Sequence, residues 1–163
     1  KVMIVTIKNK QKTHDHLMTP TIDCNIDDYN STLSALKSFL RRSIPYRSNA
    51  IGIAANQVAE KNSIFSIKSS GVWYQYINPK IHAYYGKPYI NHEQCLSIPG
   101  KKHIYAVERY PEIDVEYYWY CMEEFSHVDM LLTGTDALVF QHEYDHLQGI
   151  LIKDKQINKE EIT

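Results

Sequence analysis

The sequence predicts an α+β fold, in which mixed, largely antiparallel β-sheets pack around a central helix late in the chain. Two observations favour this class. Helical apolar spacing at 27–42 is followed by several strand-like segments, and a second apolar helix is expected at 134–148. This order lacks the regular strand–helix alternation of parallel-sheet folds. A length of 163 residues favours one domain, so we expect residues 1–163 to form a single domain with a short C-terminal tail.

The amino-terminal part is expected to hold a strand, an irregular stretch and one helix. Residues 2–7 (VMIVTI) are apolar and predict a strand, whereas residues 8–26 are polar and predict irregular structure. Asp27 or Asp28 can cap a helix that ends near Arg42. The apolar stripe of this helix is formed by Leu33, Leu36 and Leu40.

Strands are expected throughout the middle of the chain. The segments 63–68 and 72–78 are rich in apolar and β-favouring residues, and the turn-forming residues Ser69, Ser70 and Gly71 lie between them. Further strands are expected at 81–85, 104–109 and 112–121. The expected order is therefore helix, many strands, helix, which favours the α+β class.

The composition argues against several classes of protein. The formal net charge is -1, with 18 basic and 19 acidic residues, which disfavours direct nucleic-acid binding. No apolar run approaches the roughly 20 residues of a membrane span, so no membrane contact is expected. The sparse, odd set of cysteines is unlike a secreted disulfide framework and favours a reducing compartment. These cysteines are Cys24, Cys95 and Cys121.

The helix expected at 134–148 contains the pattern HEYDH. Its two histidines, His142 and His146, are four residues apart and lie about 40° from each other around a helix axis, so both can bind one cation. Glu143 projects about 100° from His142, where it can take a proton from water beside the cation. The alternative is that these are ordinary helix residues, because so short a pattern also arises by chance.

A catalytic metal site needs a third protein ligand and an open position for water. Metzincin proteases continue the pattern as HExxHxxGxxH, but Ile152 occupies the position of the third histidine and has no donor atom. A downstream glutamate, as in thermolysin-like proteases, would have to be Glu160 or Glu161 in a short polar tail. Both protease patterns are therefore disfavoured, and the third ligand is expected upstream.

Two upstream segments supply candidates. Cys95 lies in a polar stretch, and a thiolate is a strong ligand for Fe(II) or Zn(II); the alternative is a small buried residue. Gly52 lies among small residues that let the backbone approach a ligand closely. Gln57 in the same segment can offer its amide to a developing oxyanion, although glycine among alanines is also typical of close packing.

Three ordered stretches resemble the signature motifs of the peptide deformylase family. They are IGIAANQ at 51–57, EQCLS at 93–97 and QHEYDHLQGIL at 141–151, which match the patterns GxGxAAxQ, EGCLS and HExxDH. The resemblance extends over roughly residues 17–152 and implies a peptide deformylase-like fold around the HExxH helix. It also implies a metal-dependent hydrolase that removes the N-terminal formyl group from formyl-methionyl polypeptides and releases formate.

The resemblance implies a role for each matched residue. Glu143 would take the proton of the attacking water and pass it to the leaving amine. Gln57 and the backbone N–H of Leu96 would hold the oxyanion. The metal would be one divalent ion, Fe(II) in the cell, with Zn(II) or Ni(II) as alternatives. Its ligands would be Cys95, His142 and His146.

The same resemblance implies a substrate pocket and a supporting ion pair. The methionine side chain would lie in an apolar slot, with Gly52 beside the substrate backbone. Glu93 and Arg109 would pair behind the metal ligands and fix a histidine or the Cys95 segment; a surface salt bridge is the alternative. The slot would be lined by Ile51, Leu138 and Val139, and core packing is an equal alternative for the last two.

The chain departs from the family pattern at two motif positions and at its end. Ala50 replaces the first glycine of GxGxAAxQ, and Gln94 replaces the glycine of EGCLS. A left-handed backbone at Gln94 would be costly and would displace the Leu96 N–H. Only 17 residues follow His146, which argues against the ribosome docking that longer C-terminal helices support in many bacterial members.

The implied partners are N-formylmethionyl peptides or nascent chains, bound by a monomer. The expected compartment is the cytoplasm of a bacterial or virus-infected bacterial cell, or an organelle if a targeting segment has been removed.

Two other functions fit parts of the sequence. A zinc peptidase would cut internal peptide bonds without Cys95. A binding module would keep the fold and metal but not catalysis, against which the intact Glu143 and Gln57 argue.

Overall fold

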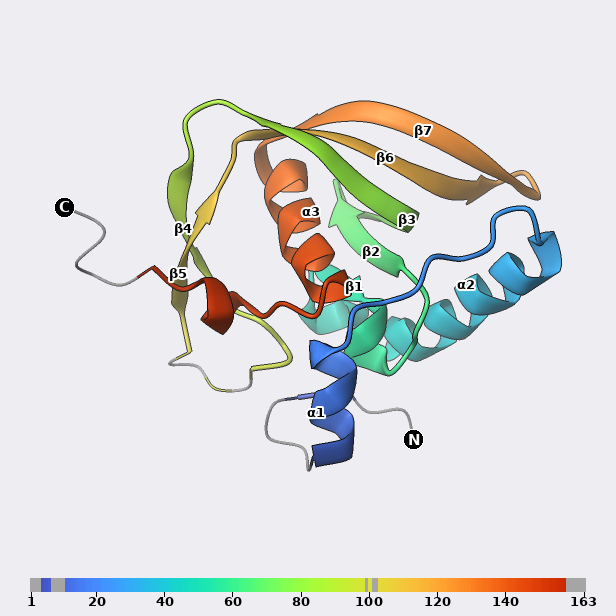
Figure 1. The fold of residues 1–163 in the computed structure, drawn as a ribbon, viewed down its shortest axis with the longest axis horizontal. Helices are drawn as coiled ribbons and strands as arrows, with labels where there is room; N and C mark the ends of the chain where they lie inside the picture. Colours follow the sequence, from blue (N-terminus) through green and yellow to red (C-terminus); the bar gives the residue numbers. More distant parts are fainter. Residues whose placement is uncertain (1–3, 7–10, 99, 101–102, 158–163) are drawn as a thin grey trace.

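The structure is a computed structural model that describes residues 4–6, 11–98, 100 and 103–157 (Figure 1). Helices lie near both ends of the described chain, and strands occupy its middle. The elements are α1 (Gln11–Met18), α2 (Tyr29–Ser43), β1 (Gly52–Ala54), β2 (Ile64–Ser69), β3 (Val72–Tyr85), β4 (Tyr89–Glu93), β5 (Tyr105–Arg109), β6 (Glu112–Cys121), β7 (Glu124–Thr133) and α3 (Gly134–Leu147), with short 3-10 turns η1 (Ile44–Asn49), η2 (Ala55–Val58) and η3 (Ile152–Lys155).

Two antiparallel sheets surround the helix α3. The larger sheet has five strands in the order β1-β2-β3-β6-β7, and the smaller sheet pairs β4 with β5. Figure 1 shows α3 in the centre of the molecule, below β3, β6 and β7, with β4 and β5 to its left. Helix α3 contacts β1, β2, β6 and β7. The predicted α+β class with largely antiparallel sheets is confirmed.

The helix α3 is central because its side chains fill the space under the larger sheet. Phe140 is fully buried and meets the ring of Phe65 edge to face, with 4.9 Å between ring centroids. Its ring also lies 5.4 Å from that of Tyr76 on β3. Aromatic pairs at these separations add to the stability gained by burying apolar area. The helix is thereby held against the sheet on the side that carries its apolar residues.

Helix α2 confirms the helix expected at 27–42. Its N-cap is Asp28, whose carboxylate accepts a hydrogen bond of 3.0 Å from the backbone N–H of Ser31. Such caps satisfy a backbone donor that the first helical turn leaves unpaired. Leu36 and Phe39 are buried, whereas Leu33 and Leu40 of the expected stripe are half-buried. One face of α2 therefore covers the core.

The turn between β2 and β3 consists of Ser70 and Gly71, whereas Ser69, which was expected in the turn, is the last residue of β2. Its residues Ser70 (φ 48°) and Gly71 (φ 83°) both have positive φ, which matches the twist of paired strands. The strands expected separately at 72–78 and 81–85 form the single strand β3. The strand continues because its irregularity is absorbed by register shifts and by a positive φ at Asn78, rather than by a break.

Several other expectations at the level of elements were wrong. Within the strand expected at 2–7, residues 4–6 are not in a strand, and the rest lie outside the described residues. The stretch 8–26 was expected to be irregular but contains α1. The strands β1, β4 and β7 were not expected, because β1 has three residues and the other two mix polar with apolar side chains. Pairing with neighbouring strands, rather than local apolar pattern, determines all three.

Candidate active site

The three motif segments lie on different elements and meet at one cleft of about 970 Å³. The first runs through β1 into η2, the second begins at the last residue of β4, and the third comprises the carboxyl-terminal half of α3 and the residues that follow it. Residues of all three motifs line the cleft, together with Leu138 and Val139 from earlier in α3. The motif residues are Ile51, Gly52, Gln57, Glu93, Cys95, Leu96, His142 and Glu143. The fold therefore brings together residues that are up to ninety positions apart in the sequence.

Cys95, His142 and His146 form a compact set of potential metal ligands. Each offers one ligand atom, and these atoms all lie within 4.8 Å of one another. The Sγ atom of Cys95 is 3.2 Å from Nε2 of His146. Donor atoms on a tetrahedral Zn(II) or Fe(II) ion, with bonds of about 2.0–2.3 Å, are separated by a similar length. Two imidazoles and one thiolate thus fit a divalent metal ion with one further open position.

The charges around these atoms also favour a cation. Burial opposes ionisation of Cys95, but the nearby His146 and His142 outweigh it and hold the pKa of the thiol well below its ordinary value. Burial opposes protonation of His142, yet contacts with Cys95 and Glu93 outweigh it and raise its pKa well above the ordinary value. The metal-free site thus stabilises positive charge where the ligand atoms converge.

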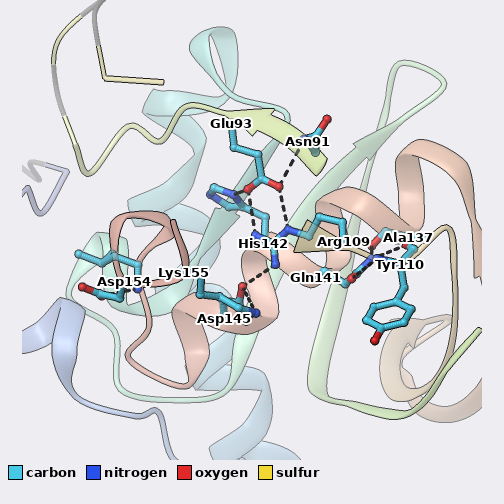
Figure 2. Close-up of polar contacts among 11 residues, drawn as sticks. Asn91, Glu93, Arg109, Tyr110, Ala137, Gln141, His142, Asp145, Asp154 and Lys155 are labelled. Carbon is cyan, nitrogen blue, oxygen red and sulfur yellow. Dashed lines mark hydrogen bonds and ion pairs between the residues drawn. The ribbon is translucent and has the colours of Figure 1, made fainter. Parts of the chain in front are cut away.

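His142 is oriented by a chain of buried ion pairs (Figure 2). Its Nδ1 atom lies 2.7 Å from Oε2 of Glu93, which leaves Nε2 available as the metal donor. Arg109 donates to both carboxylate oxygens of Glu93, from Nε at 2.7 Å and from Nη2 at 2.9 Å. Arg109 is 1% exposed and Glu93 is 7% exposed, so this pair is not a surface salt bridge.

Asp145 extends this chain, a connection that the helical spacing alone did not suggest. It accepts a 2.6 Å hydrogen bond from Nη1 of Arg109 and contacts Nζ of Lys155 at 3.0 Å. Asp145 falls three positions after His142 on the same helix, and its place inside the HEYDH pattern was the available signal. Lys155 comes from η3, and nothing in the sequence pattern pointed to it. The support behind His142 thus reaches beyond α3 and β5.

Glu143 lies on the cleft side of α3 and is buried. Burial raises its pKa to about 7, although His142 and His146 oppose the shift. Its Oε2 atom has no hydrogen-bond partner among the described residues. A Cβ atom added at Gly52 would lie 2.7 Å from Cδ of Glu143, so only glycine leaves room for this carboxylate. The close approach explains why the first motif needs its glycine here.

Gln57 faces the cysteine segment from η2. Its Oε1 accepts a 2.9 Å hydrogen bond from the backbone N–H of Ala54, which leaves the amide nitrogen pointing towards the site. That nitrogen lies 3.6 Å from Cys95 Sγ and 3.1 Å from the hydroxyl of Ser97. Gln94 is not among the described residues with positive φ, so glutamine is accommodated there without backbone strain.

The residues expected around the methionine slot differ in exposure. Ile51 is 60% exposed at the mouth of the cleft, whereas Val139 is 4% exposed and belongs to the main core cluster. Leu138 is half-buried and lines the cleft. Val139 therefore serves core packing as well as the cleft wall, and Ile51 does not serve core packing.

Asn56 is a further polar residue that the sequence reasoning did not single out. It is buried, and its side-chain amide donates to the backbone carbonyls of Leu17 and His146. These bonds tie η2 to α1 and to the carboxyl end of α3. The signal available in the sequence was its position next to Gln57 in the first motif.

A profile of the polypeptide deformylase family matches residues 3–161 of the chain. The chain belongs to this family. It is 30% identical over 161 residues to peptide deformylase 2 of Nostoc sp., an alignment that covers 92% of this chain and 80% of that protein. The deformylase-like fold implied by the sequence motifs is confirmed by comparison with solved structures.

Two crystal structures illustrate that likeness. The peptide deformylase of Thermotoga maritima superposes with a TM-score of 0.79 at 26% identity, covering 96% of this chain and 98% of that one. A peptide deformylase from Synechococcus elongatus, in complex with actinonin, gives a TM-score of 0.78 at 27% identity and covers 99% of this chain and 81% of that one.

Membership in the family assigns the reaction. The protein is a metal-dependent hydrolase that removes the N-terminal formyl group from formyl-methionyl polypeptides. It thus acts on nascent peptides. Among the helices in the described ranges, none is both long and apolar enough to span a bilayer.

Proposed function

We propose that Cys95, His142 and His146 hold the metal ion and that Glu143 moves the protons of deformylation. The observation that carries this proposal is the convergence of three ligand atoms within 4.8 Å of one another beside a buried carboxylate. A bound divalent metal supplies Lewis-acid activation of water and of the formyl carbonyl. The residues of the chain supply positioning, proton transfer and stabilisation of the oxyanion.

Glu143 is the general base and then the general acid. It accepts the proton that the attacking water loses, and it delivers that proton to the amine that leaves as the C–N bond breaks. A pKa near 7 suits both steps, because the carboxylate can hold and release a proton at neutral pH. Glu143 lines the cleft, and its Oε2 atom has no hydrogen-bond partner in the described part of the chain, which supports this role.

Gln57 and Leu96 stabilise the oxyanion that forms from the formyl oxygen. The Oε1 atom of Gln57 is held by Ala54, so its amide N–H groups remain directed towards the cleft. The backbone N–H of Leu96 supplies a second donor from the opposite segment. Donors that are fixed in advance stabilise developing charge without the cost of reorganising.

The methionine side chain of the substrate occupies the apolar part of the cleft. Leu138 and Val139 from α3 form its floor, and Ile51 covers it from the mouth. Gly52 lets the substrate backbone pass close to β1. The exposure of Ile51, at 60%, suits a residue that is covered only when a peptide binds.

Glu93 and Arg109 position the metal ligands without touching the reacting atoms. The 2.7 Å contact between Glu93 and Nδ1 of His142 supports this assignment. Such partners fix the orientation of a ligating imidazole and raise its basicity. Asp145 belongs to the same support through Arg109.

The native ion is proposed to be Fe(II), with Zn(II) or Ni(II) able to occupy the same donors, because thiolate and imidazole suit all three. Residues 1–163 are proposed to act as one catalytic domain and as a monomer, since one chain supplies every proposed ligand and catalytic group.

The proposed compartment is a reducing cytoplasm, with an organelle as the alternative. The free thiols of the described chain support a reducing compartment. Ribosome docking is not required for this chemistry.

The test is formate release from a formyl-methionyl peptide by the Ni(II) or Fe(II) form. Glu143→Ala is expected to keep one metal ion per chain while losing about 100- to 10,000-fold in kcat, because only the proton carrier is removed. Glu108→Ala, on an exposed position of β5, is the matched control and should retain activity. Wild-type turnover by metal-loaded Glu143→Ala would contradict the proposed role.

A further inference from the structure

A second cluster of metal-binding side chains lies on the outer face of the larger sheet. Glu116 on β6 and Asp129 on β7 are direct partners in the antiparallel register. Val115, next to Glu116, is buried in the core on the α3 side. Because successive strand residues point to opposite faces, Glu116 and Asp129 point away from the catalytic site. His82 from β3 and His127 from β7 complete the cluster.

A bulge places His82 in this cluster. Ile81 pairs with Val115, and Ala83 pairs with Asp114, so His82 is the extra residue on β3. Bulges of this kind redirect a side chain relative to the regular pleat. The Nε2 atom of His82 consequently lies 3.1 Å from Oε2 of Glu116.

The distances match those between donor atoms around one ion. The Nε2 atom of His127 is 3.5 Å from the same Oε2 of Glu116, and its Nδ1 is 3.4 Å from Oδ2 of Asp129. Ligand atoms of His82, Glu116 and Asp129 all lie within 4.8 Å of one another. Donors on a tetrahedral Zn(II) with bonds of about 2.0–2.2 Å are separated by about 3.3–3.6 Å.

We propose that this cluster binds a Zn(II) ion through His82, Glu116 and Asp129, with His127 as the fourth side chain of the site. Imidazole and carboxylate donors suit Zn(II), and three strands contribute to them. Lys80 occupies the other carboxylate oxygen, Oε1 of Glu116, at 3.2 Å and leaves Oε2 facing the histidines. The alternative is that protonated histidines pair with the carboxylates without an ion.

Binding here would join β3, β6 and β7 on the face that carries no catalytic group. Since β7 is the edge strand of the sheet, an ion bound to both β3 and β7 would tie the edge to the interior of the sheet. The site is independent of the proposed catalytic roles. Its loss is therefore expected to leave formate release unchanged.

The experiment uses the holoenzyme with the catalytic centre filled by Ni(II) and excess metal removed. Zn(II) is titrated calorimetrically at a pH of about 7.5, where ordinary imidazoles are mostly neutral. Ni and Zn per chain are then counted after gel filtration. The wild type is expected to take up one Zn(II) per chain and to retain its Ni(II). His82→Ala should bind Zn(II) at least about tenfold more weakly, with unchanged formate release.

Two further variants make the result specific. His16→Ala removes an exposed histidine elsewhere and should bind Zn(II) like the wild type. Lys80→Met removes a competing cation and should bind Zn(II) about two- to fivefold more tightly, a gain that misfolding cannot produce. The proposal is overturned if the wild type binds Zn(II) only with an equal loss of Ni(II). It is also overturned if His82→Ala binds Zn(II) as tightly as the wild type.

Discussion

Arg109 donates hydrogen bonds to both carboxylate oxygens of Glu93, at 2.7 and 2.9 Å, and both side chains are buried. Glu93 in turn contacts His142. A charge pair buried to this degree is costly to break, because the remaining partner keeps its desolvation penalty without its compensation. The pair therefore couples the stability of the fold to the orientation of a proposed metal ligand.

Arg109→Met removes the cation while keeping a side chain of moderate length. The free energy of unfolding is expected to fall by about 3–5 kcal/mol, because Glu93 and Asp145 would be left buried without their common partner. Urea unfolding followed by circular dichroism measures the change. Arg41→Met on the exposed face of α2 is the matched control and should change stability by less than about 0.5 kcal/mol. Equal effects of the two substitutions would contradict this account.

The same pair predicts how stability depends on pH. Burial opposes ionisation of Glu93, but Arg109 and His142 outweigh it, and its pKa lies well below the ordinary value of 4.5. The unfolded chain therefore binds a proton at Glu93 before the folded protein does. The stabilisation is fully present above about pH 4.5 and is lost as the pH falls further.

Urea unfolding of the metal-free protein at several pH values between neutrality and acid measures this dependence. Glu93→Gln has no titrating carboxyl, so its stability should fall less steeply with acidification than that of the wild type. Its stability at neutral pH should also be lower, because Arg109 loses a charged partner. A slope at acid pH that is identical in the two proteins would rule out Glu93 as a source of acid sensitivity.

Gly52→Ala tests the space beside Glu143. The added methyl group would lie 2.7 Å from Cδ of Glu143, so the carboxylate must move. We expect kcat for formate release to fall at least tenfold while one metal ion per chain is retained, since misplaced catalytic groups lose rate steeply. Gly71→Ala, in a turn where an added Cβ meets nothing within 4 Å, should leave the activity of folded protein unchanged. Full activity in Gly52→Ala would show that catalysis does not require the Glu143 carboxylate to occupy this position beside residue 52.

Cys95→Ser tests the thiolate ligand directly. In the Co(II)-substituted protein, a sulfur ligand gives a charge-transfer absorption that oxygen and nitrogen ligands do not. The substitution should abolish this band and weaken metal binding, because a serine hydroxyl is a poorer ligand than a thiolate. Cys121→Ser, at the end of β6, is the control and should retain the band. Persistence of the band in Cys95→Ser would assign it to another cysteine.

The sequence predicted the motif-bearing elements better than the sheet that holds them. Helix α3 was predicted because its apolar residues and histidines recur at helical spacing, and Asp28 was among the predicted caps of α2. Strand β7 was not predicted, because its ladder with β6 depends on a register of ten paired residues that no local pattern encodes. Strand β4 was missed for the same reason, although it ends at Glu93.

At the site, the sequence predicted the residues within the motifs and the partner of Glu93. It did not predict the contacts of Asp145 and Lys155. Glu93 and Arg109 were proposed as a pair through family resemblance. Lys155 belongs to no motif, and it reaches Asp145 only because the chain folds back between α3 and η3. Asp145 lies inside the HEYDH pattern, but helical spacing alone does not indicate its contact with Arg109. Contacts between segments that are separate in the sequence can be identified only once the tertiary structure is known.

The ion-pair chain from His142 to Lys155 also bears on the order in which the protein is made. The segment after β4 that contains the proposed ligand Cys95 is synthesised well before α3, and Lys155 follows α3. Until that lysine has emerged, Asp145 lacks one of its two cationic partners. The support behind His142 is therefore complete only after the segment that follows α3 has been synthesised.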